Sequence, residues 1–354
     1  MTRLHHLQSL RGVAANLVVA DHLLSSLIKY GFLSTFYQPL VWRVGDMGVF
    51  IFFVISGFIM VYTTRDMAGR PAAPLHFLEK RLIRIVPLYW LATLLMFALL
   101  HLSGKGGTPG ELLRSLFFLP YYSGQPPEAR PLLGQGWSLN YEMLFYALFA
   151  LALFFRGWRF LVVLLGLFAL LLGLGAARQT LGLPDRSVLA FYGNPIILLF
   201  LAGGGLGALR LRLKRTLRLR RPLLLALLLV AAGIGCFALG QRYWLALPGA
   251  YACGLLSVAL CVFAPEWKEG AIARFWEVLG DGSYSTYLFH TFWLAVLNRV
   301  LLGGGEARLW VYALAALAGA NLVGILAYRL LERPLLRGLR ALLFRASGRR
   351  NAAA

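Results

Sequence analysis

Apolar segments of about twenty residues recur along the whole 354-residue chain, and this recurrence constrains the fold more than any other feature. A helix needs about 20 apolar residues to cross a hydrocarbon core of ~30 Å. Hydrophobic residues make up 59% of the chain and charged residues only 14%, which excludes an ordinary soluble domain. The sequence predicts an all-α protein, a polytopic bundle of about ten transmembrane helices. We place them at 10–29, 47–64, 85–103, 132–155, 160–177, 189–209, 222–240, 245–264, 282–301 and 309–330.

The formal net charge of +21 is explained by the positions of the basic residues. With the N-terminus inside, 25 of the 35 Lys and Arg residues fall in the predicted cytoplasmic segments. This asymmetry follows the positive-inside rule and predicts cytoplasmic N- and C-termini. Anionic lipid headgroups are therefore the expected partners of this charge, and nucleic acid is not.

We predict one transmembrane domain over residues 1–340 and a basic cytoplasmic tail over 341–354. Glu332 and Pro334 mark the expected inner end of the last helix, and arginines beyond them fit an amphipathic tail. Residues 104–131 form the longest predicted outer loop. The three cysteines lie in apolar segments, without metal-ligand spacing, and are expected to pack in the core.

The first predicted helix carries the most informative polar pair. In LRGVAANLVVADH, Arg11 and His22 are eleven residues apart, so they face the same side of a helix about 16 Å apart along its axis. An ionisable residue within an apolar helix usually faces a cavity or pathway rather than lipid. Asp21 lies roughly 100° around the helix from His22 and is predicted to be poorly placed to orient the imidazole.

Further polar groups lie in or directly before three later helices. Arg81 and Arg84 stand beside a predicted cytoplasmic face and serve either as topology signals or as an anion site. Glu142 lies among aromatic residues and either pairs with an arginine or acts in catalysis. In GDGSYSTYLFH, the residues Ser283, Tyr287 and His290 share one helix face, which should point into the protein. No His, Glu or Cys spacing predicts a metal site.

Together these stretches resemble the acyltransferase-3 family of bacterial membrane O-acyltransferases. The resemblance rests on LRGVAANLVVADH, GVFIFFVISGFI, RLIRIVPLYW, GWSLNYEMLFY and GDGSYSTYLFH, which follow the family's motif order from about residue 8 to 338. It implies a multi-pass enzyme of the bacterial cytoplasmic (inner) membrane. Such an enzyme moves an acyl group, typically acetyl, from cytoplasmic acyl-CoA to a hydroxyl of a surface or lipid-linked glycan, without a metal.

The resemblance also assigns residues. Arg11 and His22 match the family's arginine and favoured catalytic histidine, and Arg81 and Arg84 match its arginine motif. As cations at the inner face, Arg11, Arg81 and Arg84 would hold the phosphates of coenzyme A. Glu142 matches the glutamate of the Trp-Ser-Leu motif. Ser283, Tyr284 and His290 match the late Gly-x-x-Ser-Tyr segment and, with Tyr287, are candidates to contact or support the substrate. Gln8 departs from the family, which often has an acidic residue there, and resembles its exopolysaccharide-type members.

The predicted chemistry has open alternatives. A neutral histidine, with an ordinary pKa near 6.5, suits His22 to remove the proton of the accepting hydroxyl. Transfer is then direct, or an acyl-enzyme forms first on His22 or Ser283. Glu142 orients or charge-balances His22, or pairs with an arginine. A different class, a proton-coupled transporter or flippase of a polysaccharide export system, would also use intramembrane His and Glu, but no paired broken helices or inverted repeat are visible.

Overall fold

The computed structural model describes residues 4–64, 66–104, 106–122, 129–178, 180–213, 221–238, 246–265, 270–301 and 309–352. Over these ranges the regular structure is entirely helical, as predicted, and no strand is present. The chain divides into two compact units. The first contains Met1–Thr63 and Leu199–Tyr328, and the second contains Thr64–Leu198 and Arg329–Ala354.

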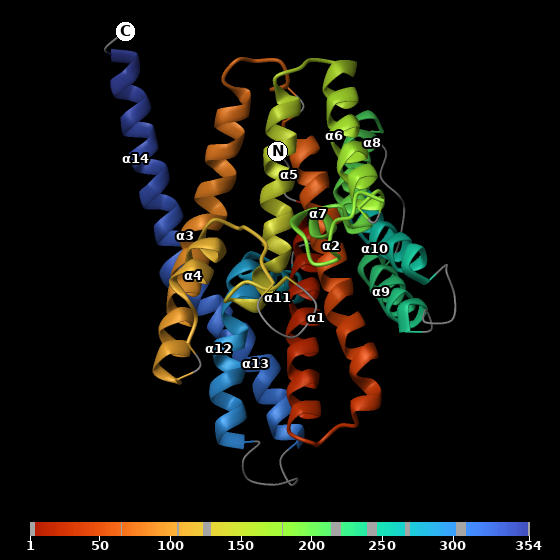
Figure 1. The fold of residues 1–354 in the computed structure, drawn as a ribbon, viewed down its shortest axis with the longest axis vertical. Helices are drawn as coiled ribbons and strands as arrows, with labels where there is room; N and C mark the ends of the chain where they lie inside the picture. The colour runs from red at the N-terminus through yellow and green to blue at the C-terminus, as the bar shows by residue number, and fades with distance from the viewer. Residues whose placement is uncertain are drawn as a thin grey trace. The chain divides into compact units, whose positions relative to one another are not determined.

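Seven helices in the described part of the chain are long and apolar enough to cross a membrane. They are His5–Lys29, Thr35–Thr64, Ala73–Leu102, Trp158–Ala176, Pro195–Arg212, Ala246–Phe263 and Leu309–Leu342. The other three predicted spans also contain helices, labelled α5, α9 and α12 in Figure 1. Helices α5 (Trp137–Leu153) and α9 (Pro222–Ala238) have 17 residues each, and α12 (Ser283–Leu301) is long enough but polar. The predicted membrane class is thus supported, while the number of ten spans stays a prediction.

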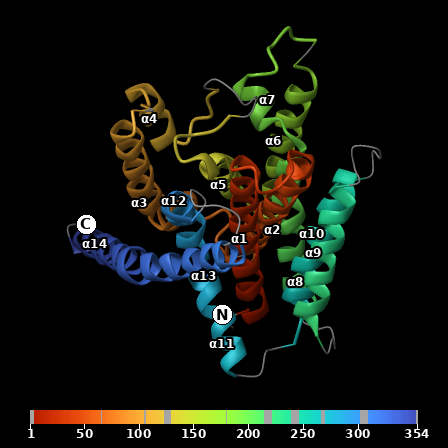
Figure 2. The same cartoon turned by 90° about the horizontal axis from the view of Figure 1, so that it is seen from below.

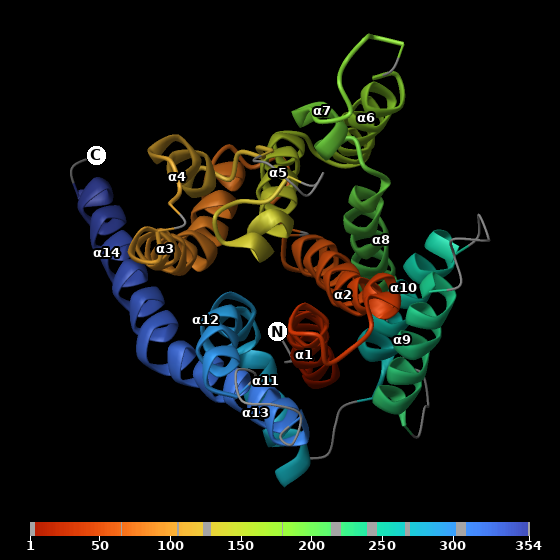
Figure 3. The ribbon, with the colours of Figure 1, turned by 60° about the horizontal axis from the view of Figure 1, so that its bottom comes forward.

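The first unit is organised around α1 (His5–Lys29). This helix packs against α10 (Ala246–Phe263), α11 (Ala271–Asp281), α12 and α13 (Leu309–Ala327), and Figure 3 shows α11, α12 and α13 gathered beside it. Helices α9 and α10 pack side by side, which is visible in Figure 2. A cluster of Leu23, Leu294, Leu297, Tyr312 and Ala316 is buried where α1, α12 and α13 meet. The catalytic candidates of α1 therefore lie on the central helix of their unit.

Helix α2 (Gln38–Thr64) approaches its neighbours through glycines. A Cβ atom at Gly48 would lie 2.5 Å from the Ala14 carbonyl oxygen of α1. Gly57 and Gly203 make the same kind of close backbone approach between α2 and α8 (Leu198–Arg212). Small residues permit this close packing of helices in membrane bundles.

The second unit contains α3 (Ala73–Leu102), α4 (Pro109–Leu116), α5, α6 (Trp158–Ala176), α7 (Val188–Tyr192) and α14 (Arg333–Ala352). Helix α3 packs against α4, α5 and α14, and α6 packs against α5 and α7. Pro87 lies inside α3 without ending it. The two arginines of the RLIRIVPLYW motif are therefore within a 30-residue helix and not in a loop.

Several predicted boundaries are wrong because amphipathic or capped helices extend beyond the apolar cores. Residues 38–46 and 73–84, predicted as loops, belong to α2 and α3, and residues 271–276 belong to α11. The span 189–209 is broken between α7 and the 3₁₀ turn Pro195–Ile197 that precedes α8. The last helix does not end at Pro334, because a π-helical turn at Tyr328–Glu332 leads directly into α14. This wider turn tolerates the absence of a backbone N–H donor at Pro334.

The predicted outer loop contains a well-formed short helix, α4. Thr108 and Glu111 form a reciprocal capping box at its start, and Phe118 adopts a left-handed φ of 57° after its end. The Ser115 hydroxyl lies 3.0 Å from that of Tyr121 and accepts the Leu132 N–H at 3.0 Å. Burial raises the pKa of Tyr121. Residues 123–128 of this loop, including Pro126 and Pro127, lie outside the described residues, as do residues 214–220 of the basic turn.

Candidate active site

His22 lies on α1 with its ring fixed by its own helix. Its Nδ1 is 2.9 Å from the Val18 carbonyl oxygen, one turn earlier. A carbonyl oxygen only accepts hydrogen bonds, so we assign the proton of the neutral ring to Nδ1. Nε2 then carries the basic lone pair. The His22 side chain is 35% exposed, so the imidazole that the sequence predicts to face a cavity or pathway is accessible from outside its unit.

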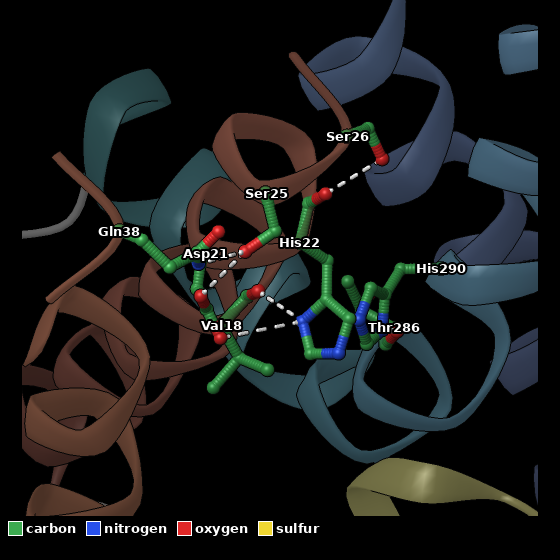
Figure 4. Close-up of polar contacts among 8 residues, drawn as sticks. All are labelled: Val18, Asp21, His22, Ser25, Ser26, Gln38, Thr286 and His290. Atoms are coloured by element: carbon green, nitrogen blue, oxygen red, sulfur yellow. Dashed lines mark hydrogen bonds and ion pairs between the residues drawn. The ribbon is translucent and has the colours of Figure 1, made fainter. Parts of the chain in front are cut away.

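Asp21 lies closer to His22 than its position on the helix suggests, although the Val18 carbonyl, and not Asp21, makes the hydrogen bond to the ring. Its Oδ2 is 3.6 Å from the Nδ1 of His22, within ion-pair range although too long for a hydrogen bond. The angle of 100° separates the Cβ atoms, but side-chain torsions bring the carboxylate back to the ring. Ser25 donates to the Oδ1 of Asp21 at 3.4 Å, and Gln38 donates to Ser25 at 3.2 Å (Figure 4).

A glycine of α2 makes room for this carboxylate. A Cβ atom at Gly45 would lie 2.5 Å from the Oδ2 of Asp21 and 2.9 Å from its Cβ. Real Cβ atoms do not show contacts this short, so any larger residue at Gly45 must displace Asp21 or the helix. Gly45 thus allows α2 to pack closely against α1 and also leaves space for the carboxylate that lies beside His22.

His290 on α12 packs against His22. The two ring centroids are 4.9 Å apart with an interplanar angle of 80°, an edge-to-face arrangement. Figure 4 shows the His290 ring beside the edge of His22 that lies away from Nδ1. His290 is fully buried, and its Nδ1 is 3.0 Å from the Thr286 carbonyl oxygen. Its buried Nε2 has no hydrogen-bond partner among the described residues.

The rest of the predicted stripe on α12 is also buried. The Tyr287 ring is 6.4 Å from that of His290 and 6.0 Å from that of Phe52 on α2. Ser283 has no exposed surface and lies at the first position of α12, about 10 Å along the axis from His290. Tyr284 is half-buried. The prediction that this face points into the protein is confirmed for Ser283, Tyr287 and His290.

Arg11 lies about 16 Å from His22 along α1 and takes part in a polar chain with α11. Its Nη1 donates to the Oε1 of Gln8 at 3.2 Å, and the Nε2 of Gln8 donates to the Oδ1 of Asp281 at 2.6 Å. Gly280 permits this close approach to the backbone of Gln8. Gln8 thus links Arg11 to a carboxylate of the GDGSY segment.

The remaining candidates lie in the second unit. The guanidinium carbon of Arg81 is 5.7 Å from the ring centroid of Phe77 and 6.0 Å from that of Tyr146, distances typical of cation–π contacts. The Tyr146 hydroxyl donates a hydrogen bond to Glu142. Arg84 is half-buried one turn along α3 from Arg81. Tyr146 was not among the residues predicted from the sequence, although its i+4 spacing from Glu142 in the EMLFY segment could have indicated it.

The structure thus brings together Asp21, His22, Tyr287 and His290 in the first unit, with Arg11 at the other end of α1. It brings Arg81, Glu142 and Tyr146 together in the second unit. Within the described ranges, no three His, Cys, Asp or Glu side chains form a group able to hold a metal ion.

His22 lies on the central helix of its apolar unit, and a hydrogen bond to its own helix fixes its ring. This arrangement is compatible with intramembrane proton-transfer chemistry. Comparison with known families makes the class specific: residues 4–329 match the acyltransferase domain of the acyltransferase-3 family, and the chain belongs to this family. It is 41% identical over 310 residues to the exopolysaccharide production protein ExoZ of Rhizobium meliloti (strain 1021). That alignment covers 84% of this chain and 92% of ExoZ. No solved structure matches the chain.

Proposed function

We propose that this protein is a membrane O-acyltransferase that moves an acyl group, acetyl in the simplest case, from acyl-CoA to a hydroxyl of an exopolysaccharide or its lipid-linked precursor. Membership of the acyltransferase family supports the reaction class, and the name of the 41% identical relative supports the glycan acceptor. The observation that carries the residue assignment is the geometry of His22. Its Nδ1 is held by the Val18 carbonyl while part of the ring is exposed.

In this proposal His22 is the general base. Its Nε2 takes the proton of the accepting hydroxyl while the hydroxyl oxygen forms a bond to the thioester carbonyl carbon. The carbon–sulfur bond then breaks, and the protonated His22 returns its proton to the thiolate of coenzyme A. The Asp21 carboxylate, 3.6 Å from Nδ1, favours the positively charged imidazolium formed in between.

Direct transfer is favoured over an acyl-enzyme on serine. Ser283 has no exposed surface, and no general base lies within hydrogen-bond distance of its Oγ among the described residues. An acyl-serine requires an accessible hydroxyl activated by such a base. His22, by contrast, is accessible and has a defined basic nitrogen.

The arginines are assigned to the donor. Guanidinium groups bind phosphate oxygens in a bidentate manner, and Arg11, Arg81 and Arg84 are proposed to hold the phosphates of coenzyme A. Glu142 and Arg81 both contact Tyr146, which favours a supporting role for Glu142 at these arginines over direct catalysis. The family resemblance favours a bacterial inner-membrane location, and the charge asymmetry of the sequence supports an orientation with both termini in the cytoplasm.

Helix α14 carries the proposed lipid-binding charge. Arg333, Arg337 and Arg340 are exposed on it, which suits contact with anionic headgroups of the inner leaflet. Arg345, predicted as part of the same tail, has a side chain outside the described residues.

The proposal is tested with membrane vesicles that contain the full chain or its His22→Ala variant. Radiolabelled acetyl-CoA and glycan extracted from a strain lacking this protein serve as substrates. We expect acyl transfer by the wild type and a loss of at least a hundredfold in the variant at equal protein level. Wild-type activity in the variant would remove His22 from the role of base. Glycan uptake without acyl transfer by the wild type would instead support a transporter.

A further inference from the structure

His290 offers a buried acceptor directly beside His22. Its Nδ1 lies 3.0 Å from the Thr286 carbonyl oxygen, so this nitrogen carries the proton of the neutral ring. The other nitrogen, Nε2, is then a lone-pair acceptor. Among the described residues no donor bonds to it, although it is completely buried. Buried acceptors without a partner are rare and call for an explanation.

The position of His290 provides that explanation. The ring centroids of His22 and His290 are 4.9 Å apart, and the rings are nearly perpendicular. His290 lies beside the His22 edge that includes Nε2, as Figure 4 shows. The lone pair of the neutral His290 ring costs little free energy beside His22 while the His22 imidazole is neutral. Once His22 is protonated, the same lone pair faces a cation and becomes stabilising.

We propose that His290 is a positioning residue for the acyl transfer, a neutral acceptor that fixes the His22 ring and stabilises its protonated form. This inference rests on the proposed role of His22 as the base. His290 exchanges no proton with the substrate in this proposal. The proton moves from the accepting hydroxyl to His22 and then to the coenzyme A thiolate, while the lone pair of His290 remains an acceptor throughout.

Among the described residues, two other ionisable groups lie beside the pair. On α1 the neighbour is Asp21, and on α12 it is Tyr287, whose ring is 6.4 Å from that of His290. From α2 the contact of Tyr287 is Phe52, and from α13 the contact of Thr286 is Gly324, neither of which titrates. A change in the pH profile after substitution of His290 is therefore ascribed to the histidine pair with its neighbours Asp21 and Tyr287.

Two variants separate electrostatics from packing. His290→Phe keeps a ring against His22 but removes both nitrogens, whereas His290→Gln places an amide acceptor near the position of Nε2 and loses the ring. His101→Phe is the matched control, because His101 makes the same type of contact, from Nδ1 to the Phe97 carbonyl oxygen, on an exposed part of α3. Initial rates are measured against pH with radiolabelled acetyl-CoA and extracted glycan, in vesicles containing equal amounts of monodisperse protein.

For His290→Phe we expect kcat to fall roughly tenfold, KM for acetyl-CoA to stay within about twofold, and the acid limb to move about one unit to lower pH. His290→Gln should recover to within about threefold of wild type, and His101→Phe should match wild type. A rate for His290→Gln no better than for His290→Phe, with an unmoved acid limb, would show a packing role and overturn the proposal. Activity that survives in His22→Ala would refute the underlying function instead.

Discussion

Replacing Asp21 by asparagine tests the electrostatic part of the mechanism most directly. Asn has nearly the same shape, so Ser25 and Gly45 keep their neighbour while the charge disappears. A unit charge pair near 4 Å is worth about 1 kcal/mol in water and about 4 kcal/mol at an effective dielectric constant of 20. Because the His22 side chain is 35% exposed, the lower part of this range applies. We take roughly 1 to 2 kcal/mol, a factor of about 5 to 30 in rate.

The sign of the pH effect follows from the same contact. The carboxylate favours the protonated imidazole, so its removal should move the acid limb of kcat/KM to lower pH, by about 0.7 to 1.5 units for 1 to 2 kcal/mol. The assay is the rate of radiolabelled acetyl transfer in vesicles between pH 5 and 9. Asp185→Asn is the control, because that carboxylate pairs with Arg178 but is 74% exposed. An Asp21→Asn profile that coincides with wild type in height and position would refute the reasoning.

Two further predictions concern space and charge. Gly45→Ala should lower the rate at least fivefold, because its Cβ would lie 2.5 Å from the Asp21 carboxylate, whereas Gly205→Ala, with no atom within 4 Å, should be neutral in rate. Equal rates for these two variants would exclude a role for the Gly45 contact. Arg84→Lys keeps the charge but loses the planar fork, so KM for acyl-CoA should rise roughly fivefold or more while kcat changes little. An unchanged dependence of the rate on acyl-CoA concentration would contradict phosphate binding by Arg84.

The helical architecture follows from the sequence because apolar length alone indicates a membrane helix. The same criterion misses helices that are held by caps or by one packed face. Thr108 and Glu111 indicate the start of α4 by their capping-box spacing, and α11 buries one face against α1. Hydropathy does not predict the helix break within 189–209, because Gly193 and Asn194 interrupt a stretch whose average hydropathy remains apolar.

The candidate site was predictable where it depends on one helix. Arg11 and His22 share a face of α1 by periodicity, and Ser283 and His290 share one of α12. The contact between His22 and His290 joins residues 268 positions apart and depends on how α1 and α12 pack. The closeness of the Asp21 carboxylate to His22 was not predictable for a different reason, because helix periodicity gives the direction of a Cβ atom but not the torsions beyond it.

The polar contacts of α1 have a consequence for how the protein is made. Gln8 bonds to Asp281, the Asn16 side chain exchanges two hydrogen bonds with Asn321, and His22 packs against His290. Helix α1 therefore leaves the ribosome well before the residues that make these contacts with it have been synthesised. Until the contacting residues are inserted, these side chains of α1 must be kept out of the hydrocarbon core of the membrane, since unsatisfied polar groups cost free energy there. A chain stopped before residue 281 contains all of α1 but none of these three contacts.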